Sequence, residues 1–205
     1  MDFVRQIAQR EYYEKLISAI KEVLIYLRSV DKAYDKCALE KCFQDLCKGR
    51  KKLVNPVMEP LDAKIQKFME EEYEPGVFGE DDRTEFYTIL GERVRSKSEK
   101  IIADELYRYN IPYRYEMPLE LEDWGKTVIR RPDFTVISRS SGKKYIYEHF
   151  GMMDDPDYVE RNMRKLDLYE KNGYILGKNL IVTHETSRSP LNVGVVDSYI
   201  EHFFV

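Results

Sequence analysis

The spacing of apolar residues divides the chain into a helical first part and a mixed second part. Through residues 3–30, apolar side chains recur every three or four positions, which is the period of one face of a long amphipathic helix. Two further helical patterns follow at about 31–48 and 60–72, and proline and glycine then mark a loop over 70–83. We therefore predict an α-helical extension over residues 1–90, which packs on the core, forms a helical hairpin, or joins a second copy or a partner protein.

In the second part, residues 91–205, stretches with the helical period of apolar residues are interspersed with stretches in which apolar and polar residues alternate, as in β-strands. Pro118 interrupts the first strand, and this places the strand at a sheet edge because proline cannot donate to the ladder. Helices and strands in this order predict an α/β domain with a mixed central sheet flanked by helices. The expected elements are a helix over 96–110, a strand over 113–121, hairpin strands over 127–137 and 143–150, a helix from about 154 to 172, a strand over 178–183 and a helix over 195–204.

The composition is that of an ordinary folded protein. With 205 residues, of which 43% are hydrophobic and 34% charged, the chain can bury a core of its own. It has no apolar run of about 18 residues, and its first residues lack the layout of a signal peptide. Cysteines at 37, 42 and 47 fit neither a zinc site nor a disulfide framework. We therefore expect no membrane partner, reduced thiols and a cytoplasmic location.

Charge alone gives no indication of a nucleic-acid partner. The net charge is −4, whereas nucleic-acid-binding domains are typically basic. Basic residues do cluster locally, at 93–97, 130–131, 143–144 and 161–165. Each cluster is consistent either with a wall of a binding groove or with an ordinary solvated face.

Two carboxylates fall at matching positions of the predicted hairpin. If the strands close symmetrically about Ser140-Ser141, Asp133 lies opposite Glu148, one step beyond the pair Phe134 and Tyr147. Opposed Cβ atoms are about 4.5–5.5 Å apart, and like charges there are destabilising. A cation between the two side chains would remove the repulsion, and carboxylate oxygens favour Mg²⁺ or Mn²⁺.

The sequence Pro132-Asp133, followed by Glu148 on the next strand, resembles the active-site motif of the PD-(D/E)XK nuclease superfamily. The predicted element order over residues 92–184 is similar to that family as well, which implies a restriction-endonuclease-like αβββαβ core. The resemblance implies that Asp133 and Glu148 hold the metal, with the backbone carbonyl of His149 as a third ligand. It also implies that Glu99, near the start of the first core helix, holds or orients the metal. Alternatively, Glu99 only caps that helix through the pattern Ser96-x-x-Glu99.

The chain departs from the family motif at one position. The family has lysine two residues after the second acid, where this chain has Phe150. Lys165, on the following helix and four residues before Tyr169, is our candidate for a displaced catalytic lysine. In the alternative, the Lys165 stem packs and its ammonium group reaches solvent. The His149 ring is expected on the opposite sheet face, packed or hydrogen-bonded, and would act as a general base or ligand only if Gly151 bends the strand end.

The resemblance implies a metal-dependent phosphodiesterase that acts on DNA, with RNA as a further substrate to consider. Its expected catalytic residues are Glu99, Asp133, Glu148 and Lys165, and its expected cofactor is Mg²⁺ or Mn²⁺. The alternative is a catalytically degenerate module that binds nucleic acid or protein, which Phe150 and the acidic net charge favour. In a third interpretation, the N-terminal helices serve as a platform in a larger complex. Trp124 is expected at a turn, where it packs or touches DNA.

Overall fold

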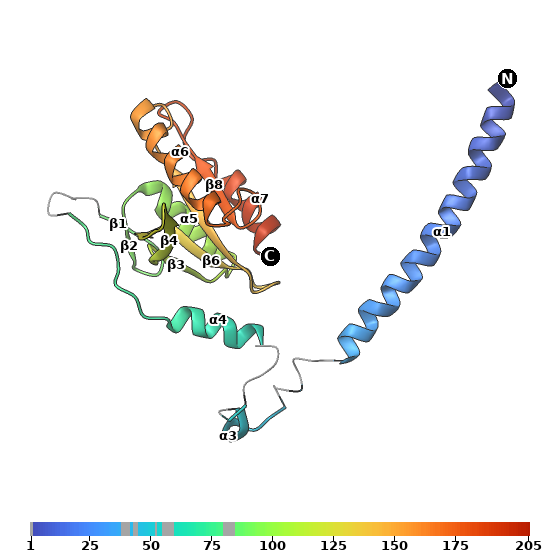
Figure 1. Ribbon diagram of the computed structural model, residues 1–205, viewed down its shortest axis with the longest axis horizontal. Helices are drawn as coiled ribbons and strands as arrows, with labels where there is room; N and C mark the ends of the chain where they lie inside the picture. Colours follow the sequence, from blue (N-terminus) through green and yellow to red (C-terminus); the bar gives the residue numbers. More distant parts are fainter. Residues whose placement is uncertain (1, 38–41, 43–44, 52, 55–59, 80–84) are drawn as a thin grey trace. The chain divides into compact units, whose positions relative to one another are not determined.

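The chain folds as two compact units, Met1–Pro60 and Leu61–Val205 (Figure 1). The computed structural model describes all residues except 1, 38–41, 43–44, 52, 55–59 and 80–84. The sequence analysis placed the boundary at residue 90, whereas in the structure residues 61–90 belong with the second unit. Packing is the reason: Phe68 is 1% exposed and lies in one cluster with Met117 and Ile137.

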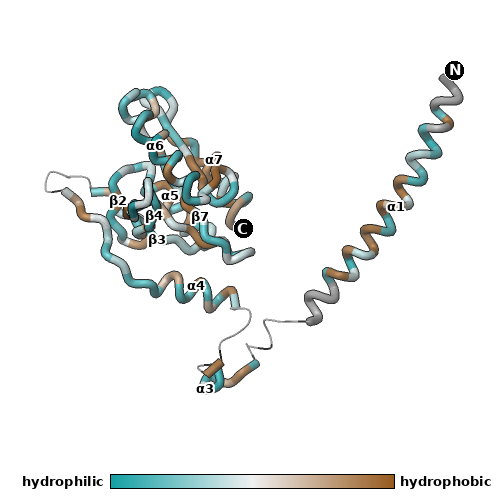
Figure 2. The backbone as a smooth tube through the Cα atoms, viewed as in Figure 1, coloured by the Kyte–Doolittle hydropathy of each residue, from teal (hydrophilic) through white to brown (hydrophobic). Residues whose placement is uncertain are grey.

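The first unit is dominated by α1 (Asp2–Cys37), and α3 (Lys48–Lys51) follows. The predicted helix over 3–30 is confirmed and continues to Cys37. The remainder of the predicted helix over 31–48 falls largely outside the described residues. Hydrophobic and hydrophilic positions alternate along α1 (Figure 2). No helix in the described part of the chain is long and apolar enough to cross a membrane.

The second unit is built on a mixed four-stranded sheet in the order β3-β6-β7-β8. β6 is antiparallel to both of its neighbours, β3 and β7, and β8 is parallel to β7. β3 lies at an edge, as the sequence predicted. The predicted hairpin register is also confirmed, since Phe134 pairs with Tyr147 and Val136 with Tyr145. The strands are β3 (Tyr113–Tyr115), β6 (Phe134–Ile137), β7 (Lys144–Phe150) and β8 (Leu180–His184).

Helices cover both faces of this sheet, so the predicted α/β class with a mixed sheet is confirmed. Tyr147 packs with Ile102 of α5 and Ile200 of α7, whereas its neighbour Ile146 packs with Leu168 of α6. Successive strand residues point to opposite faces, so α6 lies on one face and α5 with α7 on the other. The helices are α5 (Lys97–Arg108), α6 (Pro156–Lys171) and α7 (Val193–Phe203), and α4 (Leu61–Glu70) precedes them.

Two of the predicted strands are each split in the structure. The stretch 113–121 becomes β3 and β4 (Leu119–Asp123), and 127–137 becomes β5 (Lys126–Arg130) and β6. Pro118 and Pro132 lie at the two breaks, where a residue without an N–H cannot continue a ladder. β4 and β5 pair with each other as a separate hairpin. A second small pair, β1 (Phe86–Tyr87) with β2 (Arg93–Val94), precedes α5.

Candidate active site

The two hairpin carboxylates lie on the sheet face that α6 covers. Glu148 is two residues after Ile146 on β7, so both side chains point to the face that packs against α6. The Glu148 side chain is 1% exposed. Asp133 directly precedes β6, and the register of β6 with β7 brings it opposite Glu148. The backbone N–H of His149 donates to Asp133 Oδ2 at 2.6 Å and fixes its orientation. The structure therefore brings the predicted pair together.

Two side chains from α6 bind Glu148. Lys165 Nζ lies 2.6 Å from Glu148 Oε2, and the Tyr169 hydroxyl donates to Glu148 Oε1 at 2.5 Å. Residues four apart share a face of a helix, so the spacing of Lys165 and Tyr169 lets both reach one carboxylate. The alternative of a solvent-directed lysine is wrong, because the Lys165 side chain is only 26% exposed and its ammonium is paired.

Glu99 lies at the start of α5 and is held by three donors. Its carboxylate accepts hydrogen bonds from the Arg95 backbone N–H at 2.9 Å, the Tyr115 hydroxyl at 2.7 Å and the Ser96 hydroxyl at 2.9 Å. Ser96 is the N-cap of α5, as predicted, and its hydroxyl accepts from the Glu99 N–H at 3.1 Å. The carboxylate reaches the N–H of Arg95 instead of that of Ser96, so the cap is a variant of the predicted capping box. The sequence analysis missed Tyr115, whose partner is distant in sequence.

The cluster of Asp133, Glu148 and Lys165 holds two acidic groups and one basic group. Burial raises the pKa of Asp133 well above its usual range; the negative charges of Glu148 and Glu99 add to this, and Lys165 opposes it. Burial by itself would lower the pKa of Lys165, but the carboxylates of Glu148 and Asp133 outweigh it, and the net shift is upward. Burial followed by the charge of Glu148 raises the pKa of Tyr169, which therefore remains a neutral donor. Two carboxylates thus share one ammonium group.

His149 points away from this cluster, because it follows Glu148 on the strand. Its Nδ1 lies 3.0 Å from the Thr183 hydroxyl, and its Nε2 lies 3.4 Å from Glu185 Oε1. Ser98 also donates to Glu185, at 2.8 Å. Burial lowers the pKa of His149, although Glu185 works in the opposite direction. The ring is therefore packed and neutral, and only the backbone of His149 lies beside Asp133.

The donor set beside α6 suits a hard divalent cation. Asp133, Glu148 and the His149 carbonyl offer oxygen ligands, which Mg²⁺ and Mn²⁺ prefer. Within the described ranges, no group of three or more His, Cys, Asp or Glu residues is arranged to hold a metal ion. The Glu99 carboxylate already accepts three hydrogen bonds. The chemistry thus fits two carboxylate ligands, and the negative charge of Glu99 also raises the pKa of Asp133.

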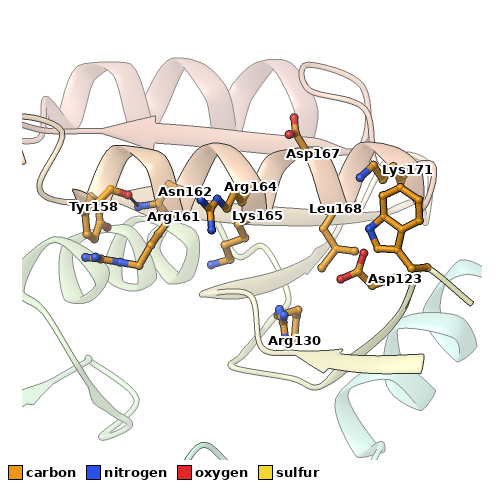
Figure 3. A pocket seen from close by; sticks show the side chains of 11 residues that line it. Asp123, Arg130, Tyr158, Arg161, Asn162, Arg164, Lys165, Asp167, Leu168 and Lys171 are labelled. Carbon is orange, nitrogen blue, oxygen red and sulfur yellow. Dashed lines mark hydrogen bonds between the residues drawn. The ribbon is translucent and has the colours of Figure 1, made fainter. Parts of the chain in front are cut away.

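A groove of about 560 Å³ opens beside Lys165, between α6 and the β4–β5 hairpin (Figure 3). Arg130 lines it from β5, and Arg161 and Lys171 line it from α6. Trp124, at the turn of the hairpin, also lines the groove and is 90% exposed. The sequence analysis noted Arg130, Arg161 and Trp124 separately and did not single out Lys171; only the fold places these residues along one groove.

Comparisons with known proteins give little indication of function. No family model matches the chain. An uncharacterized protein of Methanocaldococcus jannaschii is 31% identical to it over 88 residues. The matched segment is 42% of this chain and 7% of that relative, so the chain spans only a small part of the relative's length.

Proposed function

We propose that the protein is a metal-dependent nuclease that hydrolyses phosphodiester bonds of DNA, with the PD-(D/E)XK type of core. One observation carries the proposal: Asp133 and Glu148 lie side by side on a helix-covered sheet face, with Lys165 as the ammonium partner of Glu148. A buried carboxyl of raised pKa, gathered with a second acid and a lysine beside a groove, is typical of catalytic sites. The raised pKa of Asp133 shows that this arrangement does not favour two bare carboxylates.

Each residue has a role in this proposal. Asp133, Glu148 and the His149 carbonyl would hold Mg²⁺ or Mn²⁺. When bound, such an ion supplies a water of lowered pKa and polarises the scissile phosphate. Tyr169 and the His149 N–H orient the two carboxylates. Lys165 Nζ would donate to a phosphate oxygen as charge develops there, and thereby replace the lysine that the motif lacks at Phe150.

A degenerate binding module is the second candidate. It is favoured by the contact of Lys165 with Glu148, because an ammonium group that permanently neutralises a buried acid would occupy the place of the metal. The two candidates differ in a single property, which is turnover. The same measurement of turnover, made with RNA, tests whether RNA is a substrate.

We also propose self-association through α1. Apolar side chains along it follow the alternating three-and-four spacing of a coiled-coil seam, and all of them are exposed. A helix with such a stripe gains stability by burying it against an equivalent helix. The seam consists of Tyr13, Leu16, Ile20, Val23, Leu27 and Val30.

Cleavage of plasmid and linear DNA with Mg²⁺ or Mn²⁺ tests the proposed activity. Asp133→Asn should abolish it, whereas the control Asp62→Asn, at an exposed acid of α4, should retain it. Parallel reactions with RNA of the same sequence determine which nucleic acid is cut. If the wild type binds metal but cuts neither, the protein is the degenerate binding module.

A further inference from the structure

The groove beside Lys165 is positively charged on an acidic protein. Five cationic and two acidic side chains line it, although the whole chain carries a net charge of −4. Arg161 lies 5.9 Å from the Tyr158 ring, and Figure 3 shows it on the same side of α6 as Lys165. Figure 3 also shows Asp167 pointing to the other side of the helix. Locally concentrated positive charge of this kind attracts phosphates.

An aromatic ring stands at the far end of the same groove. Trp124 occupies the hairpin turn at a positive φ of 49°, and Gly125 follows at 76°. Both residues are thus in the left-handed region, which gives the tight turn of a two-residue hairpin loop. A bulky residue is uncommon there, yet the turn holds the indole 90% exposed. Lys171 Nζ lies 5.5 Å from the ring centroid and leaves much of the ring open.

The size and chemistry of the groove favour one class of ligand. A volume of about 560 Å³ lies within the range of small-molecule sites and suits about one or two nucleotides at a time. Lys171 follows Lys165 by six positions, or about 9 Å along the helix axis. An exposed indole gains most from a base that has no other stacking partner, and in a duplex every base is already stacked.

We infer that the groove binds an unpaired nucleic-acid strand, with Trp124 stacked on a base about one or two nucleotides from the phosphate at Lys165. Arg130, from β5, binds a backbone phosphate in the groove, and Arg161, one helical turn before Lys165 and away from Lys171, binds the phosphate beyond Lys165. The inference rests on the proposed function, because it gives the substrate of that site as a single strand or an unpaired end.

The test uses the full chain in EDTA, so that binding is measured without cleavage. Trp124 is the only tryptophan, so its fluorescence reports directly on stacking. We expect an oligothymidylate of about 12 nucleotides to quench it and to bind more tightly than a blunt duplex of the same length. Anisotropy of the labelled strand should show about 5- to 150-fold weaker binding for Trp124→Ala, with Trp124→Phe in between.

Charge variants give an independent readout. Arg130→Gln should lower the slope of log K against log salt by about 0.7, while Lys67→Gln, an exposed lysine of α4 outside the groove, should not change it. Equal binding of strand and duplex, with no change in Trp124 fluorescence, would overturn the inference. If duplex cleavage by the wild type persisted in that case, the proposed function would still stand. Quenching without any cleavage would contradict the proposed function alone.

Discussion

Replacing Asp133 by asparagine should stabilise the metal-free protein while it removes the proposed activity. The substitution keeps the shape of the side chain and an oxygen that can accept the His149 N–H. It removes a negative charge that Glu148 and burial both oppose. Residues of a functional site often reduce the stability of the fold, so replacing one of them should raise stability while activity is lost.

The magnitude follows from the repulsion between the two acids. At about 5 Å, the Cβ spacing of directly opposed residues, two ionised carboxylates would repel by about 3 kcal/mol at an effective dielectric of about 20. Lys165 offsets part of this through its contact with Glu148. We therefore expect Asp133→Asn to raise the free energy of unfolding by about 1–2 kcal/mol at neutral pH. For a unit of this size the corresponding rise in Tm is about 3–6 °C.

The pH dependence gives the prediction a definite sign. A carboxyl with a raised pKa in the folded state binds more protons when folded than when unfolded, so the wild type loses stability as pH rises through that window. The asparagine variant lacks this loss. Its advantage should be small near pH 4, the usual pKa of the unfolded acid, and should grow toward neutral pH.

Scanning calorimetry of both proteins in EDTA, across this pH range, measures the effect. Asp62→Asn serves as the control, because Asp62 is exposed on α4 and its replacement should change little. A variant that is less stable than the wild type at neutral pH would refute the reasoning, as would an advantage that shrinks as pH rises.

Two further predictions concern Lys165 and α1. Lys165→Met leaves its buried carboxylate partner without a counter-charge, so the metal-free protein should lose about 2–4 kcal/mol of stability by urea denaturation. Its cleavage rate should fall at least about 100-fold, whereas Lys67→Met should match the wild type in both assays. The double variant Ile20→Glu, Leu27→Glu should be a monomer when its mass is measured by light scattering, whereas the wild type should be self-associated. Ser18→Glu, on the polar side of α1, should leave the self-association unchanged. A wild type that is already monomeric would contradict the coiled-coil proposal.

Local chemistry made part of this structure predictable. The hairpin register follows from the period-two alternation of apolar residues and from the turn at Ser140-Ser141, and it brought Asp133 opposite Glu148. The i, i+4 spacing of Lys165 and Tyr169 predicted one shared face, and both residues bind Glu148. Such features depend on neighbours in sequence or on a single pairing.

Features that depend on distant packing were not predictable from the pattern. The boundary at residue 60 reflects contacts of Phe68 with residues about 50 or more positions away, which no local period encodes. Pro118 and Pro132 mark the strand breaks, but the pattern of apolar residues continues on both sides of each proline and predicts unbroken strands. The groove between Trp124 and Lys165 exists only once the β4–β5 hairpin packs against α6.

Binding of Mn²⁺ by isothermal titration calorimetry tests the central claim most directly, which is that Asp133 and Glu148 hold a divalent cation. We predict binding to the wild type with release of protons, since burial and the charge of Glu148 raise the pKa of Asp133, and a metal ligand must give up its proton. Binding should be lost in Asp133→Asn and retained in Asp62→Asn. Equal binding by Asp133→Asn and the wild type, or no binding by either, would contradict the claim.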